Sequence, residues 1–128
     1  MILDTSALMA SVLGEADAPL YAEAIRRHRE RAISAATWVE ASIVAGRRSE
    51  EATLVLDAVL ARITPEIVSL TAERARLAHD SWRRFGKGRH KAALNFGDCF
   101  AYALAIERDE PLLFKGGDFA QTDVKRAL

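Results

Sequence analysis

The chain has little cysteine, no excess of charge and no long apolar run. Its 128 residues include one cysteine, which excludes an internal disulfide and a zinc site built from several cysteines. Eighteen basic residues balance eighteen acidic ones, so only a local cluster of cations would indicate a nucleic-acid partner. No segment approaches membrane-spanning length, and no basic stretch of the signal-peptide kind precedes the first acid. We therefore expect a soluble cytoplasmic protein without a membrane partner.

Several common enzyme signatures are missing as well. The sequence contains no P-loop and no Gly-x-Gly-x-x-Gly, which argues against a nucleotide-binding domain. A phosphatase of the haloacid dehalogenase type needs a second aspartate two positions after the first, where this chain has Ser6. A receiver domain needs an acidic pair before its phosphorylated aspartate, and none precedes Asp4. The three histidines share no ligand spacing, so we assign none of them to a metal.

What is present indicates one globular domain, residues 1–128, with half of its residues hydrophobic. Short apolar segments at 1–3, 32–34, 67–70 and 112–114 alternate with helical patterns. We expect the segment 46–49 to break one of these helices and the segment 119–128 to form a short closing element. Strands that alternate with helices predict an α/β fold with a parallel sheet covered on both faces.

Four acids occupy positions where such a fold collects ligands. Asp4 directly follows the first strand, and Asp118 follows the last strand after two glycines. Asp98 falls in the first turn of an almost wholly apolar helix that Asn95 is placed to cap, and Glu40 interrupts another helix. Because ligands bind outside the carboxyl ends of parallel strands, we expect these acids to meet in one negatively charged hollow.

Each acid also has a structural explanation. Asp4 and Asp118 are suited to capping the helices that follow them, and Asp98 is suited to a capping box with Asn95. These explanations and a role in a site remain open for all three residues.

Glu40 is harder to explain as a structural residue. It lies at helical spacing among Ala36, Ile43 and Val44, which we interpret as an apolar face. Desolvating a lone carboxylate is costly, so Glu40 requires a partner, which is either an arginine or a cation.

Taken together, four converging carboxylates would repel one another and raise their own pKa values. A divalent cation relieves that repulsion, and a site of oxygen ligands alone favours Mg²⁺, with Mn²⁺ as the second choice. Such a site is suited to phosphodiester hydrolysis, because a bound metal activates water and neutralises charge on the phosphoryl group.

Three segments then carry a family resemblance: MILDTS at the start, LNFGDCFAYA at 94–103 and LFKGGDF at 113–119. With Glu40 between them, the whole chain resembles the PIN-domain ribonucleases of the VapC toxin type. The resemblance implies a three-layer αβα sandwich around a parallel sheet of four to five strands in the order 3-2-1-4-5. It also implies Mg²⁺-dependent endoribonuclease activity on RNA, a cognate protein antitoxin that inhibits the toxin, and a homodimer.

Carried over residue by residue, the resemblance matches Asp4, Glu40, Asp98 and Asp118 to the catalytic and metal-binding acids of that family. It implies that Asp4 and Asp98 are the direct metal ligands. Ser6 matches a small hydroxyl residue that supports the first acid.

Cations cluster in the loop before the acid-bearing helix. We predict that Arg89 and Lys91 contact RNA phosphates, because they lie closest to Asp98 in sequence. Relatives often carry proline where this chain has Lys91, which leaves the conformation of the loop open. Asp123 is either a fifth acid of the site or a turn residue, and we favour the turn. The alternative function is a PIN-fold module that binds RNA or protein and whose acids are structural.

Overall fold

The computed structural model describes all residues, 1–128, and consists of short strands separated by helices. In chain order the elements are β1 (Ile2–Leu3), α1 (Thr5–Val12), α2 (Ala18–Arg27), β2 (Ala32–Ser34), α3 (Ala35–Arg48), α4 (Glu50–Ile63), β3 (Glu66–Val68), α5 (Ala72–Phe85), α6 (Phe96–Arg108), β4 (Leu112–Leu113) and the 3-10 helix η1 (Phe119–Gln121). This alternation confirms the α/β class that the sequence predicts.

The strands form one parallel sheet in the order β3-β2-β1-β4. Ile2 of β1 pairs with Ala32 of β2 on one side and with Leu112 of β4 on the other. Beyond β4, a single parallel bridge between Leu112 and Arg126 stands where a fifth strand was expected. The observed strand order agrees with the first four positions of the expected order 3-2-1-4-5. The sheet has four strands, where four to five were expected.

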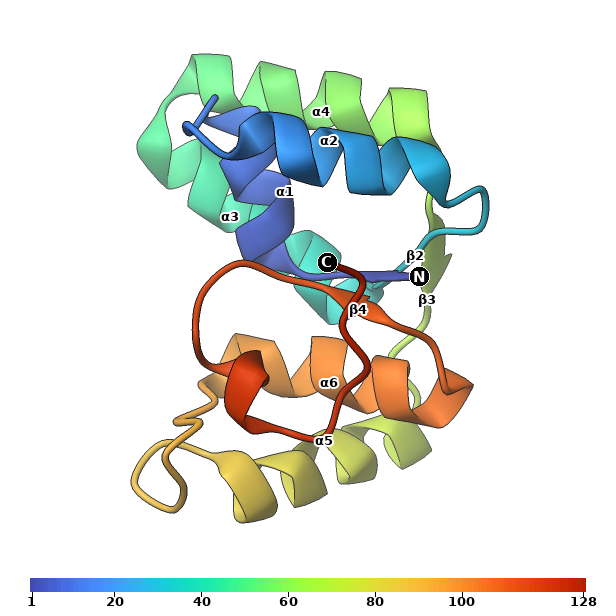
Figure 1. The fold of residues 1–128 in the computed structure, drawn as a ribbon, viewed down its shortest axis with the longest axis vertical. Helices are drawn as coiled ribbons and strands as arrows, with labels where there is room; N and C mark the ends of the chain where they lie inside the picture. Colours follow the sequence, from blue (N-terminus) through green and yellow to red (C-terminus); the bar gives the residue numbers. More distant parts are fainter.

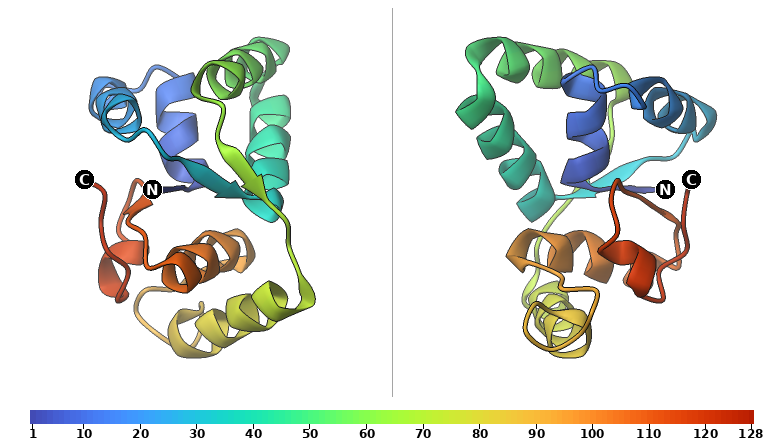
Figure 2. Two further views of the ribbon diagram at one scale, coloured as in Figure 1. Left: turned by 90° about the vertical axis from the view of Figure 1, so that its right-hand side faces the viewer. Right: turned by 60° about the vertical axis from the view of Figure 1, so that its left-hand side comes forward.

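Helices cover the two faces of this sheet (Figure 1). The four helices α1 to α4 lie on one face, and α5, α6 and η1 lie on the other; two further views agree (Figure 2). The C-terminal segment runs from η1 to the edge of the sheet beside β4. Three layers, helix on sheet on helix, are the arrangement that the resemblance implies.

Two apolar clusters fill the spaces between the layers. Successive residues of a strand point to opposite faces, so Leu3 joins the cluster under α1 to α4, whereas Ile2 joins the cluster under α5 and α6. Both side chains are fully buried, as is Leu104 in the middle of α6. Because the short central strands are buried on both faces, they read in the sequence as continuous apolar segments.

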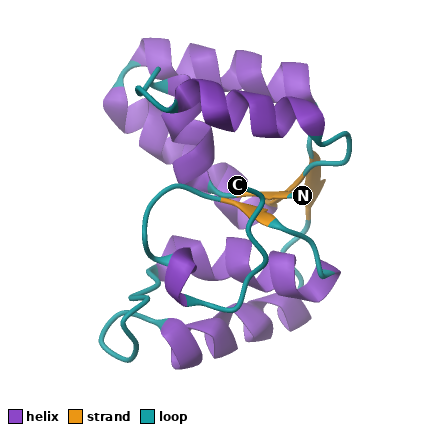
Figure 3. Ribbon diagram, viewed as in Figure 1, coloured by secondary structure: helices purple, strands orange, loops and turns teal.

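The carboxyl ends of β1, β2 and β4 lie at one edge of the sheet (Figure 3). Asp4 caps α1 immediately after β1, and Ser34 caps α3 immediately after β2. These two connections have no loop, so they hold the first turns of α1 and α3 rigidly beside the sheet.

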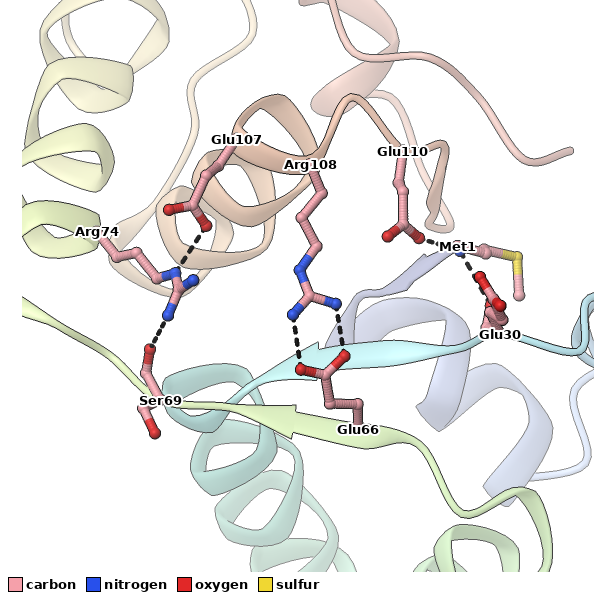
Figure 4. A network of polar contacts seen from close by, with 8 residues as sticks. All are labelled: Met1, Glu30, Glu66, Ser69, Arg74, Glu107, Arg108 and Glu110. Carbon is pink, nitrogen blue, oxygen red and sulfur yellow. Dashed lines mark hydrogen bonds and ion pairs between the residues drawn. The ribbon is translucent and has the colours of Figure 1, made fainter.

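The opposite edge, at the amino ends of the strands, carries a network of ion pairs (Figure 4). Arg108 at the end of α6 makes two bonds to Glu66 of β3, of 2.6 and 2.7 Å. The amine of Met1 contacts the carboxylate of Glu110 and the carbonyl oxygen of Glu30. These contacts fix α6 against the sheet far from its first turn, where Asp98 lies.

Some boundaries differ from those expected. The segment 46–49 does not interrupt α3 until Ser49, because Gly46 continues the helix and Ser49 ends it while capping α4. The strand expected at 67–70 is β3 (Glu66–Val68). No helix is both long and apolar enough to cross a membrane.

Candidate active site

Asp4 is a buried carboxylate with one oxygen left without a partner. Its Oδ2 accepts hydrogen bonds from the backbone N–H of Ser6, at 2.8 Å, and from the Ser6 hydroxyl. Its Oδ1 is buried and has no hydrogen-bond partner. Burial raises the pKa of Asp4, and the charge of Glu40 raises it further, although the bonds from Ser6 oppose this shift. Capping therefore uses only one of the two oxygens.

Ser6 links Asp4 to the loop that carries Asp118. The Ser6 hydroxyl donates to Asp4 and accepts the backbone N–H of Lys115, at 2.9 Å. The ammonium of Lys115 in turn pairs with Asp17, at 2.7 Å, and with Glu15, both in the connection between α1 and α2. The backbone of Lys115, at the start of the β4–η1 loop, is thus bound to α1, and its side chain is bound to the connection that follows α1.

Glu40 reaches the same edge from α3. Its Oε2 accepts a hydrogen bond of 2.7 Å from the Thr5 hydroxyl, next to Asp4 in the chain. The expectation that Glu40 lies on a buried apolar face was wrong, because the side chains of Ile43 and Val44 are 55 % and 39 % exposed. The buried residues of α3 are small ones, which let α3 pack closely on its neighbours: Thr37, Ala41 and Ala45. Glu40 is half-buried, and no arginine pairs with it.

Asp98 both caps a helix and belongs to the acidic group. Its Oδ2 accepts the backbone N–H of Asn95, at 2.8 Å, while Asn95 Oδ1 accepts the backbone N–H of Asp98, at 3.0 Å. Burial, followed by the charges of Asp4, Asp118 and Glu40, raises the pKa of Asp98 to about 7. The structure therefore places three other acids close enough to Asp98 for their charges to raise its pKa.

Asp118 is the most exposed of the four acids. It stands before η1, but its side chain makes no capping hydrogen bond. The capping explanation for Asp118 is therefore wrong. The buried ring of Phe119, next in the chain, anchors the loop on which Asp118 projects.

None of the four acids forms an ion pair, although ten ion pairs occur elsewhere in the chain. No three acidic, histidine or cysteine side chains are already arranged as a metal-binding cluster. Three surface hollows of about 460, 470 and 270 Å³ lie between α2 and α4, between α5 and α6, and at the edge with the ion-pair network. None is lined by any of the four acids, so the expected hollow is not among them.

The donor set at this edge fits a hard divalent cation. Oδ1 of Asp4 accepts no hydrogen bond, and burial together with the charges of Asp4, Asp118 and Glu40 raises the pKa of Asp98. Mg²⁺ is commonly held by only one or two carboxylates and keeps several waters, so it does not need a cage of three acids. Asp4 and Asp98 are the carboxylates that would hold such an ion.

The other predicted residues lie in the loop before α6 and in the segment after η1. The guanidinium of Arg89 stacks over the ring of Trp82 at 4.5 Å, and Lys91 is exposed; neither bonds to any of the four acids. Asp123 accepts a 2.6 Å hydrogen bond from the Tyr102 hydroxyl and pairs with Arg84 at 2.8 Å. Asp123 is thus occupied in holding the C-terminal segment to α5 and α6.

Two residues near the acids were not identified from the sequence. Thr5 and Gly97 both contact Glu40, and neither was expected there. The available signal for Gly97 was a glycine inside a helix, where it is unfavourable and needs a reason.

The sequence matches a known protein family over nearly its whole length. Residues 1–125 match the family model described as PIN domain. The chain belongs to the PIN-domain family. Within it, this PIN domain is a relative of the VapC ribonucleases. It is 45 % identical over 130 residues to Ribonuclease VapC28 of Mycobacterium tuberculosis, covering all of this chain and 98 % of that one. It is also 45 % identical over 125 residues to Ribonuclease VapC of Mycolicibacterium smegmatis, covering 97 % of both chains.

Solved structures share the fold of this PIN domain. The crystal structure of Mycobacterium tuberculosis VapC20, described as a sarcin-ricin loop cleaving toxin, superposes with a TM-score of 0.77 at 16 % identity, over 96 % of this chain and 95 % of that one. A toxin–antitoxin complex from Klebsiella pneumoniae contains a chain with a TM-score of 0.71 at 20 % identity, over 95 % and 92 % of the two chains.

Proposed function

We propose that this PIN domain is a Mg²⁺-dependent endoribonuclease and the toxin of a toxin–antitoxin pair. The observation that supports the metal most directly is the buried, unpartnered Oδ1 of Asp4 in a group of four acids that no cation neutralises. The relatives named VapC ribonuclease support RNA as the substrate. The single cysteine and the RNA substrate agree with action in the reducing cytoplasm.

In this proposal Asp4 and Asp98 hold the metal, and Glu40 and Asp118 complete the acidic group. When bound there, Mg²⁺, or Mn²⁺ in its place, would supply an activated water and would neutralise charge on the phosphoryl group. The chain's own residues keep the carboxylates in place: Ser6 fixes one oxygen of Asp4, and the capping box fixes one oxygen of Asp98. The second oxygen of each carboxylate accepts no hydrogen bond.

RNA is held in this proposal by the basic loop before α6. Arg89 and Lys91 are exposed there and free of ion pairs, so both are available to phosphates. Such contacts position the backbone without reading the base sequence. The stacking of Arg89 on Trp82 leaves its charge in place while restricting the side chain.

Two protein partners belong to this proposal. We propose a small protein antitoxin that blocks the acidic edge, with an arginine placed among the acids where the cation would bind. The Klebsiella neighbour, solved as a toxin–antitoxin complex, supports a partner of this kind. We also propose a homodimer, since exposed apolar side chains such as Val39 and Ile43 on α3 would be covered by a second copy.

The test is cleavage of total cellular RNA by the purified chain, with mapping of the products. Asp98→Asn is expected to abolish the internal cuts while the protein stays folded. If the acids are only structural, as in a binding module, the same change would lower the melting temperature and alter no cleavage. Absence of cuts with the wild-type chain in Mg²⁺ would contradict the proposal.

A further inference from the structure

Gly97 lies directly against the carboxylate of Glu40. A Cβ placed on Gly97 would stand 2.0 Å from Glu40 Oε1, 2.4 Å from Glu40 Cδ and 2.6 Å from Oε2. These distances are far inside van der Waals contact. The carboxylate of Glu40, which comes from α3, therefore occupies the space that any other residue at position 97 would fill.

Nothing in the backbone explains a glycine at this position. Gly97 is buried within the first turn of α6 and does not have a positive φ. In a helix of this kind alanine is the better residue, because glycine loses more conformational freedom on folding. The close approach of Glu40 is the feature that requires the missing side chain.

Thr5 contacts the same carboxylate. Its hydroxyl donates a 2.7 Å hydrogen bond to Glu40 Oε2 from the first position of α1, one residue after Asp4. Thr5 and Gly97 are the immediate chain neighbours of Asp4 and Asp98. Glu40 is thus held between segments that carry two other members of the acidic group.

We propose that Thr5 and Gly97 are positioning residues that seat the Glu40 carboxylate among the acids. Gly97 supplies the room and Thr5 supplies the hydrogen bond that fixes the orientation. This inference rests on the proposed metal-dependent nuclease site, and it assigns to that site two residues that do not themselves bind the metal or the RNA.

Gly97→Ala separates this role from a role in folding. The atoms in conflict with the new methyl group are the far end of a flexible side chain, so Glu40 turns away while the fold is kept. The helix itself gains a better helix former. We therefore expect a thermal midpoint that is unchanged or higher, together with weaker Mn²⁺ binding and slower RNA cleavage, each by on the order of 10- to 100-fold.

Gly46→Ala is the matched control. Gly46 also lies inside a helix, but a Cβ there would meet only Thr53 Oγ1, at an ordinary 3.8 Å. This variant should gain the same helix preference and keep wild-type Mn²⁺ affinity and cleavage. Equal losses in both glycine variants would overturn the proposal.

Substitutions of Thr5 and Glu40 test the same proposal. Thr5→Val removes the hydroxyl at similar volume and should weaken Mn²⁺ binding and cleavage, whereas Thr5→Ser should keep both. In the double variant Gly97→Ala with Glu40→Asp, the shorter acid makes room for the new methyl group. We expect this pair to recover part of the Mn²⁺ affinity that Gly97→Ala loses.

A crystal structure of Gly97→Ala provides a readout that needs no activity. We expect the Glu40 carboxylate to have left its contact with position 97 and with Thr5. An unmoved carboxylate, or a variant with wild-type Mn²⁺ affinity and cleavage, would overturn the inference. Failure of the proposed function itself would appear in the wild-type chain, as absent Mn²⁺ binding and absent cleavage, and is therefore distinguishable.

Discussion

Asn95 and Asp98 hydrogen-bond each other in both directions, each side chain accepting the backbone N–H of the other residue. A carboxylate in such a capping box, near the positive end of a helix, ordinarily has a lowered pKa. The pKa of Asp98 is instead raised to about 7, since burial and three neighbouring carboxylates outweigh the cap. Asp98 therefore both caps α6 and belongs to the acidic group.

The stability of the metal-free protein should fall as the pH rises from about 5 to about 8. Folded Asp98, with a pKa of about 7, keeps its proton over a range in which an unfolded aspartate, with a pKa of roughly 4, has lost it. The folded state thus binds more protons than the unfolded state, so raising the pH favours unfolding. Urea denaturation in EDTA at several pH values measures this slope.

Mg²⁺ should reduce that slope, because a bound cation favours the ionised carboxylates. Asp98→Asn should reduce it without any metal. Stability that increases with pH across this range in EDTA would show that the four acids do not interact as described.

Asp4→Asn should stabilise the fold while it abolishes cleavage. The change removes a buried charge whose Oδ1 has no partner and leaves an oxygen that is able to accept the bonds from Ser6. We expect a gain of about 1 kcal/mol in the free energy of unfolding without metal, as at other sites where function costs stability. The rate of cleavage should fall by more than the roughly 10- to 100-fold that is typical when a residue bonded to a metal ligand is replaced.

Asp123→Asn is the control for this result. Asp123 is already satisfied by Tyr102 and Arg84, so its replacement should lower stability slightly and leave cleavage unchanged. Loss of cleavage in this variant would instead make Asp123 a fifth acid of the site.

Ser6→Ala should cost both stability and activity. It removes one donor to Asp4 and leaves the backbone N–H of Lys115 without its acceptor. An unsatisfied buried group costs about 1–3 kcal/mol, and the Asp118 loop loses its attachment to α1. Ser11→Ala, on the same helix, removes only a 3.4 Å bond to Ala7 and should change stability by less than about 0.5 kcal/mol. Thermal unfolding and RNA cleavage of both variants are the measurements.

Arg89→Ala and Lys91→Ala should weaken RNA binding in a salt-dependent manner. If each side chain neutralises one phosphate, each substitution should reduce the slope of log K against log salt by about 0.7 for single-stranded RNA. Arg26→Ala is the comparison, since Arg26 is exposed and already paired with Glu23 on α2. Equal effects from the loop and α2 variants would refute a specific role for the loop.

The positions of the acids that follow strands were predictable from the sequence. In a parallel sheet, the residue after each short apolar segment lies at the edge where the carboxyl ends of the strands meet. Asp4 and Asp118 are of this kind, and the capping box of Asp98 is visible from its spacing to Asn95. The same local patterns indicated the α/β class and the order of its helices. Each of these features depends only on residues that are close in the chain.

The surroundings of Glu40 could not be obtained in this way. The large apolar residues near it, Ile43 and Val44, suggested a buried face, but α3 packs through small side chains instead. When a helix packs through alanine, the sequence contains no large apolar residues that would indicate which face of the helix is buried. The contact of Glu40 with Thr5 joins residues 35 positions apart, and its contact with Gly97 depends on how α3 and α6 approach each other.

The most direct test of the metal site is a calorimetric titration of the purified chain with Mn²⁺ at pH 7.5, beside Asp4→Asn and Asp98→Asn. We predict saturable binding by the wild-type chain, abolished in both variants while they remain folded. Binding of equal strength in all three proteins, or none in the wild type, would contradict the account of these acids as a divalent-cation site.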